Sequence, residues 1–212
     1  MAKRLLLIAL LGYLSWILWL APAPSAQLTR ELGQTVNTAT HFDPALTIQQ
    51  PPIQQPLNAA PFTIGDYQFI PKARFQIEAR ILGHQTYRFD RLARVSPIDL
   101  ALGWGPMARD EVLEAIRIRQ SNRFYYWSTR DFPIPRRDIE RHSANMHLIP
   151  VGDSVARALR RSTVDQQIRI HGYLVDIHHR NGHYWRTSLT RDDTGAGACE
   201  IILVTLVSIL PS

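Results

Sequence analysis

Alternating apolar and polar residues mark the first clear element of the chain, a half-buried strand from Phe75 to Ile81. Tyr87 and Phe89 continue the pattern beyond Gly83, so the sequence predicts a second strand that returns alongside the first. The two strands together favour an antiparallel pair at the start of the folded region.

A short helix is expected next, because residues 96–99 read Ser-Pro-Ile-Asp. Serine is a good helix cap, proline fits the first turn, and an acid three residues after the cap completes the pattern. The sequence Gly-Trp-Gly-Pro at 103–106 ends this helix. Val112, Leu113 and Ile116 then share one face of a second short helix.

The second half of the chain mixes short strands with short helices. Apolar or β-prone runs predict strands at residues 124–127, 146–149, 168–177, 184–189 and 201–207. Residues 136–141 suit a short helix, and Asp153 and Ser154 cap another. Arg-Asn-Gly at 180–182 is a tight-turn sequence, and a polar, glycine-bearing loop follows at 190–198.

This order of elements predicts a mainly β fold with short helices, a β-rich α+β arrangement. Sequential hairpins around a small helix fit a small, partly open barrel of the OB-like kind, or an α+β sandwich. We favour the barrel.

Three regions divide the chain. Residues 1–26 predict a signal peptide or an N-terminal membrane anchor, because Lys3 and Arg4 precede 17 uncharged residues from Leu5 to Ala21. That run is long for a signal peptide and slightly short for a membrane span, so both interpretations stay open. Residues 27–61 contain QQPPIQQP and predict a flexible Gln/Pro-rich linker, and residues 62–212 form a single β-rich globular domain. The expected location is the periplasm, free or anchored to the inner membrane.

Charge and cysteine content narrow the chemistry only slightly. The formal net charge is +6, and residues 117–191 hold 14 basic against 6 acidic side chains. Such a surface suits an acidic ligand or simple solvation, and export makes nucleic acid an unexpected partner. The single cysteine, Cys199, cannot close an intramolecular disulfide, so the fold must depend on its core.

Several polar residues are candidates for catalysis. They are drawn from two histidine-bearing and turn-rich segments and comprise His142, Asn145, His147, Arg191, Asp193 and Cys199. Cys199 with His142 or His147 would suit a cysteine hydrolase, since a thiolate needs a neighbouring base or positive potential. The sequence Asp-Thr-Gly-Ala at 193–196 matches an aspartic protease motif, but turn chemistry explains it better. No metal site and no cofactor is assigned.

A second group of candidates concerns ligand binding. Trp104 lies between two glycines and either fills the core or lines a pocket. Arg123, Tyr125 and Trp127 combine positive charge with aromatic rings, as in binding platforms for polymers. The same residues also fit a strand whose alternate rings enter the core.

Three segments together resemble an uncharacterised family of bacterial exported proteins. They are SPIDLALGWGPM at 96–107, HSANMHLIP at 142–150 and SLTRDDTGAGACE at 188–200. The resemblance would cover residues 62–207 and implies a bacterial origin and a single domain. It implies no activity and no catalytic residues.

Two functions remain open from the sequence. The first is a non-catalytic binding or scaffolding module of the cell envelope, with an envelope partner, and with the membrane as a further contact if the leader is uncleaved. The alternative is a hydrolase or metal-dependent enzyme that uses the His/Asp/Cys candidates. Geometry separates them: three or more of the candidate side chains meeting in one cleft favour an enzyme.

Overall fold

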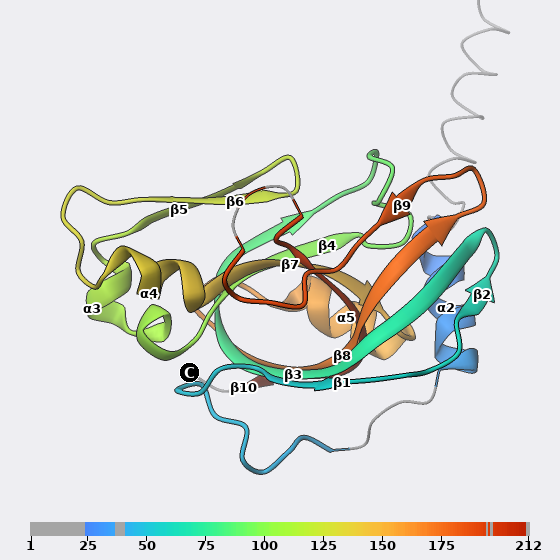
Figure 1. Cartoon of the computed structure of the whole chain (residues 1–212), viewed down its shortest axis with the longest axis horizontal. Helices are drawn as coiled ribbons and strands as arrows, with labels where there is room; N and C mark the ends of the chain where they lie inside the picture. The colour runs from blue at the N-terminus through green and yellow to red at the C-terminus, as the bar shows by residue number, and fades with distance from the viewer. Residues whose placement is uncertain (1–23, 37–40, 194, 196, 211–212) are drawn as a thin grey trace, which may run out of the picture.

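The computed structural model describes residues 24–36, 41–193, 195 and 197–210, and strands dominate the architecture (Figure 1). The helical elements are α2 (Pro24–Thr35), η1 (Gly105–Ala108), α3 (Asp110–Leu113), α4 (Arg136–Arg141) and α5 (Asp153–Arg161). The strands are β1 (Ile53–Pro56), β2 (Phe62–Ile64), β3 (Tyr67–Thr86), β4 (Ile98–Gly103), β5 (Arg117–Ser121), β6 (Phe124–Ser128), β7 (Ser143–Pro150), β8 (Gln167–His179), β9 (Tyr184–Trp185) and β10 (Glu200–Leu210).

Five strands form a ring-like arrangement that stays partly open. Their hydrogen-bonded order is β3-β4-β7-β10-β8, and β8 also pairs with β3. All the pairings are antiparallel except that between β7 and β10, which is parallel. In chain order this path reads first, second, third, fifth, fourth, with α5 between the third and fourth strands. The prediction of a mainly β, OB-like fold is therefore confirmed.

Successive side chains along the ring strands point alternately inward and outward. The inward side chains form an inner core, and the outward ones contribute to two separate outer apolar clusters. Ile98, Leu100 and Leu102 of β4 point inward and pack against Met146 and Leu148 of β7. The residues between them on both strands therefore face outward. That outer face is covered by the two-stranded β5–β6 sheet, whose inner residues pack on a separate apolar cluster.

Three of the expected elements differ from the structure, and one is the strand expected at 184–189, of which only β9 (Tyr184–Trp185) forms. Residues 96–103 do not start a helix: they enter β4, a buried strand between β3 and β7. Tyr87 and Phe89 do not form a return strand, because β3 itself continues to Thr86 and a loop follows. The capping pattern is local, and pairing with two distant strands overrides it.

The expected linker at 27–61 is also structured in its described part. Helix α2 buries Leu28 and Leu32 against the domain, and Leu46 is buried as well. Strand β1 pairs with β3 over residues 53–56. The tether prediction is therefore wrong for these residues, because apolar side chains spaced along the segment find a place in the core.

The predicted leader at 1–26 lies almost wholly outside the described residues, which begin at residue 24. Within the described part of the chain, no helix has the length and apolar character needed to cross a membrane.

Candidate functional site

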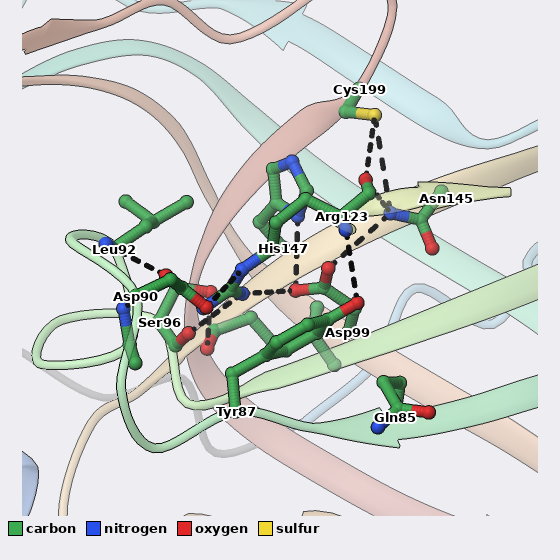
Figure 2. A network of polar contacts seen from close by, with 12 residues as sticks. Gln85, Tyr87, Asp90, Leu92, Ser96, Asp99, Arg123, Asn145, His147 and Cys199 are labelled. Carbon is green, nitrogen blue, oxygen red and sulfur yellow. Dashed lines mark hydrogen bonds and ion pairs between the residues drawn. The ribbon is translucent and has the colours of Figure 1, made fainter. Parts of the chain in front are cut away.

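A network of buried and half-buried polar side chains lies on the outer face of β4 and β7 (Figure 2). Asp99 comes from β4, Asn145 and His147 from β7, Arg123 from the β5–β6 turn, and Cys199 directly precedes β10. In OB folds the face of the second and third strands, with the adjoining loops, is the usual ligand site. Here those strands are β4 and β7, so the network occupies that face.

Strand register brings the acid and the histidine together. Asp99 lies directly opposite His147 in the antiparallel β4–β7 pair, and Ala101 lies opposite Asn145. Because alternate residues point to the same side, all four face away from the inner core. Asp99 is 0% exposed and His147 is 8% exposed, so both charges are removed from bulk water.

Arg123 occupies a left-handed turn that aims its side chain at this face. Asn122 has φ 52° and Arg123 has φ 70°, the pattern of a tight hairpin turn with two left-handed residues. A non-glycine residue in this region is uncommon and needs surrounding contacts to hold it. Its main chain supplies one, because the Arg123 N–H donates to the Tyr87 hydroxyl at 3.1 Å.

The Arg123 guanidinium joins the loop after β3 to the centre of the network. Nη2 lies 2.9 Å from both carboxylate oxygens of Asp90, and Nη1 donates to Asp99 Oδ1 at 2.7 Å and to the Ser96 carbonyl at 2.9 Å. The group also stacks 3.7 Å from the centre of the Tyr87 ring. Arg123 therefore fixes the position of Asp99 rather than projecting into solvent.

His147 is poised between an acid and a thiol, and Figure 2 shows its ring between Asp99 and Cys199. Its Nδ1 lies 2.9 Å from Asp99 Oδ1, as an ion pair whose N–H is not aligned with that oxygen. Burial lowers the pKa of His147, but the contacts with Asp99 and Cys199 outweigh burial and raise it to about 9. The imidazole therefore carries its proton at neutral pH.

Cys199 is partly exposed, and its sulfur has two polar neighbours besides His147. Sγ lies 3.9 Å from the carbonyl oxygen of Arg123 and 3.9 Å from Asn145 Nδ2. Asn145 Nδ2 donates to the same carbonyl at 3.0 Å, and its Oδ1 accepts from Gln120 at 2.7 Å. The amide of Asn145 is thus held in one orientation beside the sulfur.

Two clefts meet at Cys199. The first, here called the aromatic cleft, measures about 300 Å³ and lies between the β6 aromatic residues and the described residues of the segment 190–200. The second measures about 400 Å³ and is lined by His147, Trp185 and Arg186, among others. Cys199 and Phe124 line both. A reactant in either cleft can therefore reach the sulfur.

A buried ion pair lies at the inner part of the aromatic cleft. The Arg191 guanidinium contacts the carboxylate of Glu200, which is 1% exposed. Burial lowers the pKa of Arg191 to about 10, although the charge of Asp193 acts in the opposite direction. The guanidinium also lies 5.9 Å from the centre of the Phe75 ring, which places it over the edge of the inner core.

No family model, curated protein or solved structure matches the chain. The resemblance to an exported bacterial family therefore stays a prediction, and the site has to be interpreted from its own geometry.

The structure brings five of the six catalytic candidates to one place. Asn145, Arg191, Asp193 and Cys199 line the aromatic cleft, and His147 contacts Cys199 from the side of the second cleft. His142 is not part of the group. Its Nδ1 lies 2.8 Å from the Asp138 carbonyl at the end of α4, and its ring lies against Trp104.

The ligand-binding candidates divide in the same way. Trp104 is 1% exposed inside the inner core, so it fills space and lines neither of the two clefts described above. Tyr125 and Trp127 line the aromatic cleft, and Arg123 lines the second one. Burial raises the pKa of Tyr125 to about 12, with its hydroxyl 2.9 Å from Ser143 Oγ, although that hydrogen bond acts in the opposite direction.

Sequence reasoning missed Asp99, Glu200 and the loop acid Asp90. Asp99 was assigned to a helix start, although an acid flanked by Ile98 and Leu100 in an apolar strand is the signal that could have identified it. Asp193 accepts a hydrogen bond from Ser188 Oγ at 2.6 Å, as a turn residue. Among the described residues, no cluster of His, Cys, Asp and Glu is arranged to hold a metal ion.

Proposed function

We propose that this chain is a cysteine-dependent acyl-transfer enzyme, most simply a hydrolase of an ester, thioester or amide. The observation that carries the proposal is the line of Asp99, His147 and Cys199 at the junction of two clefts. A nucleophile, a histidine partner and a carboxylate that orients the histidine form the recurring unit of such enzymes, whatever the fold.

Each residue has a distinct role in this proposal. His147 holds its proton at neutral pH, so it acts as the positive partner of a Cys199 thiolate and not as a neutral base. Asp99 stabilises the imidazolium through its charge, 2.9 Å from Nδ1. Arg123 in turn holds Asp99 through a 2.7 Å contact, which makes it a positioning residue.

The reaction follows from these roles. The Cys199 thiolate attacks the carbonyl carbon, a C–S bond forms, and the bond to the leaving group breaks as His147 gives that group its proton. Neutral His147 then accepts a proton from water, whose oxygen attacks the thioester carbon. The C–S bond breaks, the carboxylic acid leaves, and the thiolate–imidazolium pair is restored.

Asn145 supports the charged intermediate in this scheme. Its Nδ2 lies 3.9 Å from Sγ, and the amide is already oriented by Arg123 and Gln120. A preorganised donor beside the nucleophile can stabilise the oxyanion that develops on the substrate. The contact of Nδ2 with Asp99 Oδ2 is long, at 3.5 Å, and leaves that N–H weakly committed.

Acylation of the purified chain tests the proposal. Incubation with p-nitrophenyl acetate should release nitrophenol in an initial burst and add one acetyl group to Cys199, seen by intact mass and peptide mapping. Cys199→Ser and His147→Gln should abolish the burst. His142→Gln is the matched control, because His142 is a nearby histidine that lies outside the group, and it should leave the burst unchanged.

Failure of acylation in a folded chain would refute the proposed enzymatic activity and favour the second candidate function. That candidate is a non-catalytic envelope module, and exposed Phe124 and Tyr126 beside an OB-like binding face favour it. In both cases we propose that the domain is exported, because of the apolar segment behind Lys3 and Arg4.

A further inference from the structure

The aromatic cleft is acidic, although the chain as a whole is basic. Its charged lining residues are Glu140, Asp193, Glu200 and Arg191, three carboxylates and one guanidinium, and Glu140 is also paired at 2.8 Å with Arg136, which lies outside the lining. The formal net charge of the chain is +6. An acidic hollow on a basic protein concentrates cations and disfavours anions at that point.

Glu200 has binding capacity that the protein does not use. One of its carboxylate oxygens contacts Arg191, whereas Oε2 is buried and has no hydrogen-bond partner among the described residues. A buried carboxylate oxygen without a donor is costly, and such groups are usually satisfied by a protein group, a water or a ligand. Glu200 directly follows Cys199, so a group bound to it stays close to the nucleophile.

Aromatic rings complete the lining of the cleft. Tyr125 and Trp127 lie on the face of β6 that packs inward, and both border the cleft. The faces of such rings attract cations as well as apolar groups. The guanidinium of Arg136 already lies 5.9 Å from the centre of the Trp127 ring, so one cation is in place beside this ring.

Arg191 does not make the cleft an anion site. Its Nη1 contacts Glu200, and its Nη2 donates to Gln54 Oε1 at 3.5 Å. An anionic ligand would have to compete with Glu200 for this guanidinium and would also face the carboxylates of Asp193 and Glu140. A cationic ligand would find Arg136 already on Glu140 and Arg191 on one oxygen of Glu200, but Glu200 Oε2 has no competing donor among the described residues.

We propose that the aromatic cleft is a subsite for a protonated amine of the substrate, with Glu200 Oε2 as its acceptor and the Tyr125 and Trp127 rings beside it. The substrate class is an acyl group that carries a lysine-like or other primary ammonium side chain. This inference rests on the proposed function, because it places the ammonium beside the sulfur that attacks the acyl carbon.

Chloromethyl ketones that differ only in charge test the subsite. Tosyl-lysine chloromethyl ketone and its norleucine analogue have side chains of similar length, and only the first carries an ammonium group. In both, the Cys199 sulfur displaces chloride and forms a C–S bond, so labelling is read as added mass on Cys199. The lysine probe should label at least roughly tenfold faster, and a glutamate probe should be the slowest.

Variants assign the preference to Glu200. Glu200→Gln should bring the lysine and norleucine rates together. Glu78→Gln is the matched control, because Glu78 is also a buried glutamate paired with an arginine, Arg169, at 2.8 Å, and it lies outside the cleft. The control should keep the preference. The comparison of probes on the wild-type chain needs no variant, so a Glu200→Gln chain that fails to fold leaves the test intact.

The outcomes separate the two proposals. Equal labelling of Cys199 by the lysine and norleucine probes, both faster than labelling of the urea-unfolded chain, overturns the subsite and keeps the nucleophile. Labelling by all three probes at the rate of the unfolded chain overturns the nucleophile itself.

Discussion

Raising the pH should remove a defined part of the folding stability, through the proton that His147 holds between Asp99 and Cys199. The pKa of His147 rises from 6.5 to about 9 on folding, because the contacts with Asp99 and Cys199 outweigh burial. A raised pKa means that the folded chain binds the proton more tightly than the unfolded chain. The stabilisation is therefore complete below pH 6.5 and is lost as the pH rises through 9.

The size of the loss follows from the same two values. The difference between 6.5 and about 9 corresponds to roughly 3 kcal/mol, at about 1.4 kcal/mol for each pH unit. His147 is 8% exposed, so solvent screening takes little from this figure. For a domain of this size, such a loss is a large fraction of the free energy of unfolding.

Urea unfolding at pH 6 and pH 9.5 measures the loss. In the proposed thiolate–imidazolium pair, the proton that His147 holds is offset by the proton that Cys199 gives up, so the loss is measured in chains without the thiol. The free energy of unfolding of Cys199→Ser should fall by up to roughly 3 kcal/mol more than that of Cys199→Ser/His147→Gln over this interval, because Asp99 remains and still raises the pKa of His147. Parallel pH curves for these two chains would refute the reasoning, since no extra proton would then be held at this position.

Three further predictions follow from single contacts. Asp99→Asn should slow acylation of Cys199 by at least roughly tenfold while the chain stays folded, measured by the nitrophenol burst together with circular dichroism, because the histidine loses its orienting charge. Gly172→Ala should lower the free energy of unfolding by roughly 1–3 kcal/mol in urea, because an added methyl would lie 2.2 Å from the Leu203 carbonyl oxygen. Leu32→Ala should lower the free energy of unfolding by about 2–5 kcal/mol, since Leu32 lies on the buried face of α2, whereas Arg30→Ala on the exposed face should lower it little; equal effects would mean that α2 does not pack on the domain.

Much of the fold is predictable from the sequence because its strands carry clear periodic signals. Alternation from Phe75 to Ile81 identifies the centre of β3, and the apolar run from Ile201 identifies β10. The helix-like start at Ser96 misleads because capping is a local property. The segment becomes a strand because it pairs with β3 and β7. Gly103, at the end of this strand, has no room for a side chain, because a Cβ atom there would lie 2.4 Å from the Met107 carbonyl oxygen.

The candidate site is only partly predictable, for a related reason. Cys199, His147 and Asn145 can be named as catalytic candidates from the sequence, because their side chains are chemically suited to catalysis. Their acid, Asp99, is identified only by register, since it comes to His147 from a strand 48 positions earlier in the chain. The unpaired oxygen of Glu200 also depends on which side chains surround it, and no sequence pattern specifies that.

The reactivity of Cys199 tests the central claim most directly, because the chain has only one cysteine and every alkylation event reports on it. The measurement is the rate of iodoacetamide labelling from pH 5 to pH 9, for the wild type, His147→Gln and the urea-unfolded chain. A thiolate held by protonated His147 should label at pH 6 at least roughly tenfold faster than the unfolded chain, and His147→Gln should lose this advantage. A wild-type rate that follows the unfolded chain across the whole range would contradict the account.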